Sequence, residues 1–195
     1  MDVVRVDFAL IPGDPLFAAV VDASQAITDE FHDNRNIIDG KAFPPHLSLH
    51  ICTVPRSEID RIIADMRAVT EGTDLPDITP LGVERAHGGY VMVNIERTTE
   101  IMILHEAILD VAAIARDGMD GDAYGNKYIR DSFTPHISLA KVASQDMLSA
   151  TDIGRKALGG SRTTPTRTLD LCDIGPYSER WDVLASFQNA VHNHG

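Results

Sequence analysis

The sequence contains one five-residue pattern twice, with the two copies ninety residues apart. The first copy is Pro45-His46-Leu47-Ser48-Leu49 and the second is Pro135-His136-Ile137-Ser138-Leu139. Each copy follows a polar segment, opens a run of strand-forming residues and precedes a helical pattern. Two such matches in matching contexts indicate an internal repeat. We therefore expect one domain, residues 1–195, built from two related halves.

The spacing inside each copy has a direct meaning if the copies are strands. Alternate side chains of a strand share a face, so His46 and Ser48 point the same way, about 6.6–6.8 Å apart along the strand. The same holds for His136 and Ser138. Each strand then presents a polar pair on one face and apolar residues on the other. If a pseudo-two-fold axis relates the halves, the two polar pairs meet across one cleft.

The remaining hydrophobic patterning predicts alternating strands and helices. The expected strands cover 3–11, 46–54, 78–85, 90–96, 136–142, 167–174 and 181–187, and the expected helices cover about 14–33, 57–69, 101–116 and 144–158. Several strand pairs have links too short for a parallel crossover, so we expect them to pair antiparallel. This order favours an α+β fold over a doubly wound parallel sheet.

The charge of the chain restricts its partners. Lys and Arg total 17 against 29 Asp and Glu, which gives a net charge of −12. A chain this acidic repels long duplex nucleic acid and anionic membrane surfaces unless its cations gather in one place. A small anionic substrate remains compatible with this charge, and the cations closest to the motifs in sequence are Lys41, Arg130 and Lys141.

The cysteines and the first residues predict a cytoplasmic protein. Cys52 and Cys172 fit no metal or redox spacing, which favours a reducing compartment. The first five residues, Met1-Asp2-Val3-Val4-Arg5, lack the basic start of a signal peptide, and no apolar run approaches the length of a membrane span.

Two imidazoles that face each other are suited to acid–base catalysis. One can take a proton from a nucleophile while the other gives a proton to a leaving group, because the histidine pKa of about 6.5 lies near working pH. Two hydroxyls beside them can donate hydrogen bonds to oxygens that gain charge. In-line attack at phosphorus needs this set and requires neither a metal nor a cofactor. The alternative is that the histidines and serines have structural roles only.

The paired motifs resemble the H-x-[ST]-x motifs of the 2H phosphoesterase superfamily, which includes 2′,5′-RNA ligase-like and cyclic nucleotide phosphodiesterase proteins. The closing pattern Leu169-x-Leu171…Gly175…Trp181-x-Val183 is also similar to that family. The resemblance implies a bilobal fold with two antiparallel sheets lining a central cleft and helices outside. It implies that His46 and His136 are the acid–base pair and that Ser48 and Ser138 bind phosphate.

Further residues near the motifs are candidates for substrate contacts. Lys41 and Arg130 lie in the segments before the motifs, where a cation could hold a non-reacting phosphate. Aromatic residues of these segments could stack a base or anchor the loops, namely Phe43, Phe133 and Tyr124. His50 is expected on the face of His46 and Ser48, as a substrate contact or a buried histidine. We expect His105 on a helix surface and Trp181 in the packing of the last hairpin.

These features predict a metal-independent phosphodiesterase, acting as a monomer on a nucleoside 2′,3′-cyclic phosphate, a 2′–5′ linkage, or a short or cyclic oligonucleotide. A ligase that runs the same chemistry in reverse is one alternative. A non-catalytic module that binds nucleotides or RNA ends is another, although binding alone does not need two opposed proton carriers. The sequence leaves open which histidine is the acid and which the base.

Overall fold

A computed structural model describes residues 2–32, 38–115, 129–160, 162–175 and 178–188. The elements are β1 (Val3–Pro12), α1 (Leu16–Phe31), β2 (Leu47–Pro55), α2 (Ile59–Thr70), β3 (Pro80–Arg85), β4 (Tyr90–Ile95), α3 (Thr99–Ala115), β5 (His136–Lys141), α4 (Met147–Leu158), β6 (Thr166–Asp173) and β7 (Asp182–Phe187). Every expected strand and helix is present within about three residues of its expected bounds, and the α+β class is confirmed.

The described strands form one antiparallel sheet in the order β3-β4-β5-β2-β1-β6-β7. The two motif strands, β2 and β5, are therefore neighbours at its centre. They are joined by a single residue pair, Leu47 with Ile137. The expectation of two separate sheets is wrong, because this main-chain pairing makes one sheet of the two strand groups on either side.

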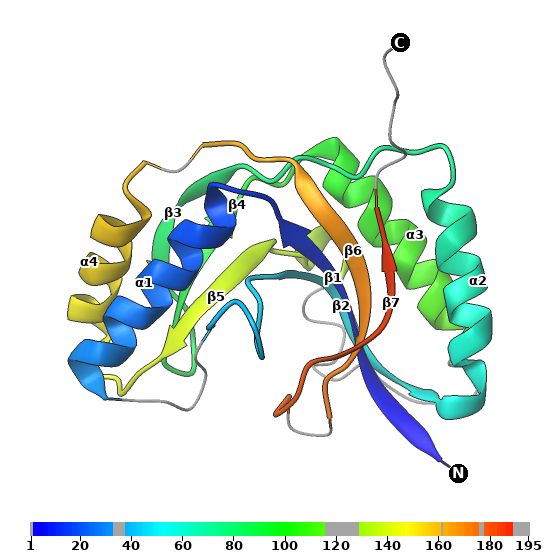
Figure 1. Ribbon diagram of the computed structural model, residues 1–195, viewed down its shortest axis with the longest axis horizontal. Coiled ribbons are helices and arrows are strands. Elements are labelled where there is room, and N and C mark those ends of the chain that lie inside the picture. The colour runs from blue at the N-terminus through cyan, green and yellow to red at the C-terminus, as the bar shows by residue number, and fades with distance from the viewer. Residues whose placement is uncertain (1, 33–37, 116–128, 161, 176–177, 189–195) are drawn as a thin grey trace.

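The helices lie in two pairs at opposite ends of the molecule, α1 beside α4 and α2 beside α3 (Figure 1). Apolar strand residues such as Phe8, Leu49 and Leu139 pack with helix residues such as Ile27 and form the core. Alternate strand residues point to the other face of the sheet.

The strand order has an internal symmetry. From the junction of β2 and β5, the next strands outward are β1 and β4, followed by β6 and β3. Along the chain, the order β-α-β-α-β occurs twice, from β1 to β3 and from β4 to β6. A duplicated unit would give this order, while the bilobal shape and the central cleft stay predictions.

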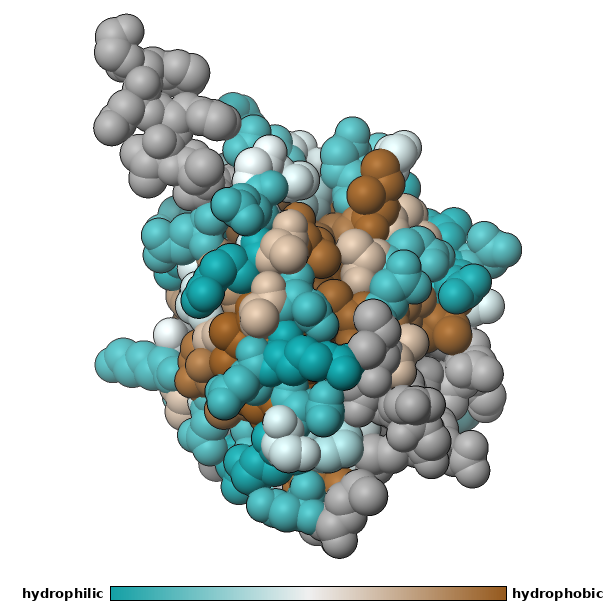
Figure 2. All heavy atoms as spheres, turned by 90° about the vertical axis from the view of Figure 1, so that its right-hand side faces the viewer, coloured by the Kyte–Doolittle hydropathy of each residue, from teal (hydrophilic) through white to brown (hydrophobic). Residues whose placement is uncertain are grey.

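Few large apolar side chains are exposed in the part of the chain that the structure describes. Figure 2 shows the end of the molecule formed by α2 and α3, where hydrophilic side chains surround smaller apolar areas. The exposed large apolar residues come singly from different elements: Val3, Leu81, Ile103, Leu148 and Val183. Among the described residues, no helix is both long enough and apolar enough to span a bilayer.

Candidate active site

The pairing of β2 with β5 brings the two motifs together. In an antiparallel pair, the register set by Leu47 and Ile137 places Ser138 opposite His46 and His136 opposite Ser48. Such neighbours share a face, and residues on the diagonal are about 7–8 Å apart, within reach of two imidazoles. The positive charge of His136 contributes to lowering the His46 pKa, which also reflects their proximity. The four motif residues therefore form one group.

The two imidazoles are held in the same way. His46 Nδ1 lies 2.9 Å from the carbonyl oxygen of Pro44, and His136 Nδ1 lies 2.8 Å from that of Thr134. In both motifs the acceptor is the carbonyl two residues earlier. A carbonyl can only accept, so each Nδ1 donates a proton and each neutral ring has its lone pair on Nε2. Both histidines thus keep Nε2 available for proton transfer.

A β-bulge follows each motif at the same position. Ala9 pairs with Ser48 and Phe8 with His50, which leaves Leu49 as the extra residue of β2. In β5 the extra residue is Leu139, because Met92 pairs with Ser138 and Val91 with Ala140. The bulges extend the repeat from the sequence to the backbone.

The first bulge corrects the expectation for His50. Strict alternation would place His50 with His46 and Ser48, but the extra residue turns it to the helix-packed face. There its ring stacks on Phe8 at a centroid distance of 6.4 Å, and only 6% of the residue is exposed. His50 therefore does not join the motif residues.

Asp7 is a site residue that sequence reasoning missed. It lies on β1 beside the first motif, and its Oδ2 accepts a hydrogen bond from Ser48 Oγ at 2.7 Å. The same oxygen is 3.9 Å from His46 Nε2. Burial raises the pKa of Asp7 to about 7, against the lowering effects of the Ser48 hydrogen bond and of Arg5. Near neutral pH this carboxyl group exists in both protonation states.

Trp181 covers His46. Their ring centroids are 4.3 Å apart, and the side chain of His46 is 19% exposed. This burial, with a smaller contribution from the charge of His136, lowers the pKa of His46 to about 4, although the hydrogen bond to Pro44 acts in the other direction. The expectation that Trp181 only packs the last hairpin is wrong, because the loop between β6 and β7 carries it to the first motif.

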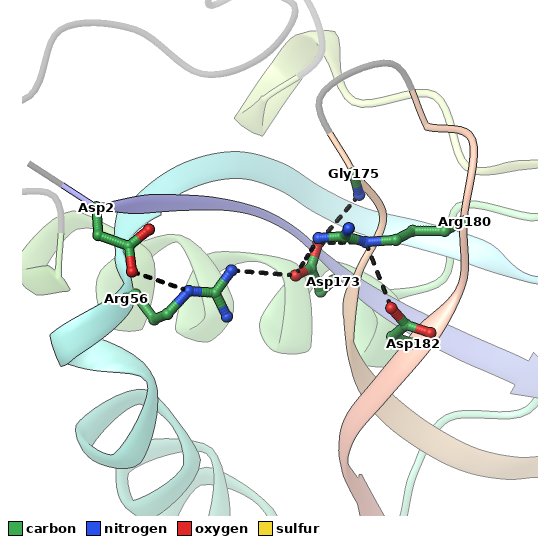
Figure 3. Close-up of polar contacts among 6 residues, drawn as sticks. All are labelled: Asp2, Arg56, Asp173, Gly175, Arg180 and Asp182. Atoms are coloured by element: carbon green, nitrogen blue, oxygen red, sulfur yellow. Dashed lines mark hydrogen bonds and ion pairs between the residues drawn. The ribbon is translucent and has the colours of Figure 1, made fainter.

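Ion pairs hold the two residues that flank Trp181. Arg180 donates two hydrogen bonds to Asp173 at 3.1 and 2.6 Å, and its Nε lies 3.4 Å from Asp182 (Figure 3). Asp173 also accepts from the amide of Gly175 at 3.0 Å and pairs with Arg56 at 3.6 Å. This network fixes the loop end from which Trp181 reaches His46.

Comparison with known proteins places this chain in a family. Residues 14–174 match the model of the 2′-5′ RNA ligase superfamily, which is most of the chain. The chain belongs to the 2′-5′ RNA ligase superfamily. The resemblance of the motifs to those of 2H phosphoesterases is thereby confirmed. No curated protein sequence matches the chain.

Solved structures share the fold of this 2′-5′ RNA ligase superfamily member. E. coli LigT complexed with 3′-AMP is 13% identical, with a TM-score of 0.55 over 97% of this chain and 99% of LigT. A phosphoesterase crystal structure is 14% identical, with a TM-score of 0.54 over 96% and 99% of the two chains. Kluyveromyces marxianus Usb1 is 11% identical, with a TM-score of 0.50 over 94% and 97%. At these identities the likeness concerns the fold alone.

The superfamily member also contains a buried histidine that connects the two motifs. His105 of α3 is fully buried, so the expectation of a helix-surface position is wrong. Its Nδ1 donates to the carbonyl of the bulged Leu49 at 2.8 Å, and its Nε2 accepts from the amide of Arg130 at 3.0 Å. Burial lowers its pKa, in keeping with a neutral ring. His105 thereby ties the first bulge to the turn before the second motif.

The aromatic candidates are placed differently from one another. Phe133 is 6% exposed and stacks flat on His105 at 4.0 Å, so it belongs to the core and cannot offer a face to a base. Phe43 is partly buried against the core. Tyr124 lies outside the described residues.

The candidate cations differ in their contacts. Lys41 is exposed, and its amide donates to Asp39 at 2.8 Å. The Arg130 side chain is 66% exposed and pairs with Glu106 at 3.9 Å. Lys141 lies 5.2 Å from the ring centroid of Tyr90. The side chains of Arg130 and Lys141 therefore have partners other than the motif residues.

Neutral polar atoms supplement the motif residues. Asn94 lies opposite His136 on β4, and its Oδ1 is buried and has no hydrogen-bond partner among the described residues. The indole nitrogen of Trp181 is also buried and has no hydrogen-bond partner among the described residues. Buried polar groups normally have partners, so a bound polar molecule would satisfy both. No group of three or more His, Cys, Asp or Glu residues suited to a metal occurs among the described residues.

Proposed function

We propose that this chain is a metal-independent phosphodiesterase that uses His46 and His136 as its acid–base pair. The substrate would be a nucleoside 2′,3′-cyclic phosphate, a 2′–5′ linkage, or a short or cyclic oligonucleotide. The observation that carries the proposal is the matched orientation of the two imidazoles, each with Nδ1 on the carbonyl two residues earlier. Superfamily membership supports phosphodiester chemistry, and its relative LigT forms a complex with 3′-AMP.

The proposed reaction is an in-line displacement at phosphorus. One neutral imidazole takes a proton through Nε2 from a water molecule, whose oxygen forms the new bond to phosphorus. The other imidazole, protonated at Nε2, gives its proton to the leaving oxygen as the old bond breaks. The base gains one proton and the acid loses one, and exchange with solvent restores both. Ser48 and Ser138 would donate hydrogen bonds to the non-bridging oxygens.

Burial suggests which histidine has which role. His46 lies beneath Trp181 with its pKa lowered to about 4, so it is neutral at working pH and ready to accept a proton. Among the described residues, no aromatic ring lies against His136 in the same way. We therefore assign His46 as the base and His136 as the acid.

The small substrate follows from the charge and the site. With 17 cations against 29 acidic residues, and with Arg130 beside Glu106 and Lys141 beside Tyr90, long nucleic acid would find few phosphate contacts. We include in the proposal that the protein works as a cytoplasmic monomer, which agrees with its charge and cysteine content.

Turnover in the presence of EDTA tests the proposal. The substrates are 2′,3′-cyclic mononucleotides, cyclic dinucleotides, larger cyclic oligonucleotides and 2′–5′ oligomers. His46→Asn and His136→Asn should each lower kcat by about 10²–10⁴-fold with little change in melting temperature. His87→Asn, in the exposed turn between β3 and β4, is the matched control and should retain full activity.

Three results would contradict the proposal. The first is near-normal turnover in either motif variant. The second is activity that EDTA abolishes and a divalent ion restores. The third is stoichiometric binding of these nucleotides with no turnover, which would favour the binding module.

A further inference from the structure

Asp7 introduces an asymmetry between the two motifs. It is 1% exposed and accepts the Ser48 hydroxyl at 2.7 Å. At the corresponding position of the second half, two residues before the partner of Ser138, stands Tyr90 on β4. The Ser138 hydroxyl has no hydrogen-bond partner within the described part of the chain. The Ser48 hydroxyl therefore already has an acceptor, whereas the Ser138 hydroxyl has none among the described residues.

The hydroxyl of Ser48 has only one proton to donate. While Asp7 is ionised it can only accept, so it takes that proton and leaves Ser48 with lone pairs toward a substrate. A phosphate oxygen also only accepts, and lone pairs facing it would repel it. An ionised Asp7 next to a phosphate adds a repulsion between like charges. Phosphate binding at Ser48 and ionisation of Asp7 therefore oppose each other.

We propose that Asp7 is a positioning residue that must be protonated when substrate is bound, so that it donates to Ser48 and Ser48 donates to a phosphate oxygen. The inference rests on the proposed function and adds a requirement to it. In this state each oxygen has one donor: Asp7 donates its O–H to Ser48 Oγ, and Ser48 donates its own O–H to the substrate. Protonation also removes the negative charge beside the phosphate.

The surroundings of Asp7 favour its neutral form. The charged or titratable groups around it are Arg5 on β1, His46 before β2, and Cys172 with Asp170 on β6. Arg5 favours the carboxylate, but burial has the larger effect and raises the pKa of Asp7 to about 7. The low pKa of His46 leaves this neighbour uncharged, so it offers no compensating cation.

Asp7→Asn tests the proposal, because an asparagine amide can donate to Ser48 as the protonated acid would and does not titrate. In the wild-type protein, KM should rise about tenfold per pH unit above the Asp7 pKa. In Asp7→Asn this rise should disappear, with kcat still governed by the histidines. Ser48→Ala should reduce the effect of Asp7→Asn on KM to the part that comes from charge repulsion, whereas Ser138→Ala should preserve the whole effect.

Asp170→Asn is the matched control. Asp170 is also a buried acid that accepts a serine hydroxyl, from Ser186 at 2.6 Å, but on the pair β6–β7. This variant should keep the tenfold rise of KM per pH unit, with its onset at a lower pH because a negative charge near Asp7 is lost. An unchanged rise of KM in Asp7→Asn, or an equal effect of that substitution with and without Ser48, would overturn the proposal.

Sulfate binding separates this inference from the proposed function. Sulfate is a tetrahedral oxyanion that does not titrate between pH 5.5 and 8.5, and its binding needs no turnover. The wild-type affinity should fall relative to that of Asp7→Asn by about tenfold per unit above pH 7. Should Asp7→Asn not fold, a carbon-13 titration of the wild-type Asp7 carboxyl in saturating sulfate decides: full ionisation at pH 6 with sulfate bound refutes the proposal, and protonation there supports it.

Discussion

The indole of Trp181 lies against the imidazole of His46, with the ring centroids 4.3 Å apart and the planes inclined by 39°. The loop that carries Trp181 is held by Arg180, which pairs with both Asp173 and Asp182. A hydrophobic ring over an imidazole removes water that would otherwise stabilise the charged form. The contact therefore links a loop near the end of the described chain to the proton affinity of the first motif.

Trp181→Ala should raise the pKa of His46 from about 4 toward the ordinary value near 6.5, because water regains access to the ring. An NMR titration of the His46 ring carbons measures this directly. Trp181→Phe keeps an aromatic ring over His46 and should leave most of the lowering of the His46 pKa in place. An unchanged titration midpoint of His46 in Trp181→Ala would show that other groups bury its ring.

Asp7→Asn should stabilise the protein at alkaline pH. The folded-state pKa of Asp7, about 7, lies above its unfolded value. Its contribution to the free energy of unfolding is therefore fully present below about pH 3.9 and is lost as pH rises through 7. His46 acts in the opposite sense, since its contribution is lost as pH falls from about 6.5 to 4.

Replacing Asp7 removes only the first of these effects. We expect a gain of about 1–3 kcal/mol in the free energy of unfolding at pH 8 and a smaller gain at pH 5, measured by urea denaturation. Asp170→Asn again serves as the control. A gain at pH 5 larger than that at pH 8 would have the wrong sign for a buried acid.

His105→Ala should destabilise both motifs together. It leaves the Leu49 carbonyl and the Arg130 amide without their partner and opens space beside Phe133. The expected cost is about 2–4 kcal/mol. Hydrogen exchange should show faster exchange at Arg130 and in the first bulge, with distant strands such as β7 protected as before. Loss of protection at only one motif would contradict the bridging role.

Substrate turnover should depend weakly on salt. Each phosphate contact contributes roughly −0.7 to −0.9 to the slope of log affinity against log salt concentration. Few cations flank the motifs, so kcat/KM should fall with a slope shallower than about −4. A steeper slope, or a preference for folded RNA over small cyclic phosphates, would indicate a long nucleic-acid ligand.

Secondary structure and the motif pair were predictable because both depend on local spacing. The periodicities of two and 3.6 residues located the strands and helices, and the repeat located both histidines. The position of His50 was not predictable, since a single extra residue at Leu49 reverses the alternation. Bulges have no distinct sequence signal in this chain.

Asp7 and Trp181 show a second reason why some site residues could not be predicted from the sequence. Asp7 stands in an apolar strand with no motif around it, and only the pairing of β1 with β2 brings it to Ser48. Trp181 reaches His46 through a loop whose course depends on Arg180 and its acidic partners. These contacts arise from pairings between distant segments, which single-sequence spacing does not encode.

The junction of β2 and β5 has a consequence for how this architecture can diversify. The other strand pairs of the sheet share five to eight registered residue pairs, but here there is one, Leu47 with Ile137, beside both histidines. One pair fixes a point of contact while the angle between the two strand groups depends on the apolar side chains beneath it. Conservative changes of volume in those side chains would then alter the gap between the imidazoles. Proteins of this architecture would then differ in the width of substrate they accept while both H-x-S motifs stay unchanged.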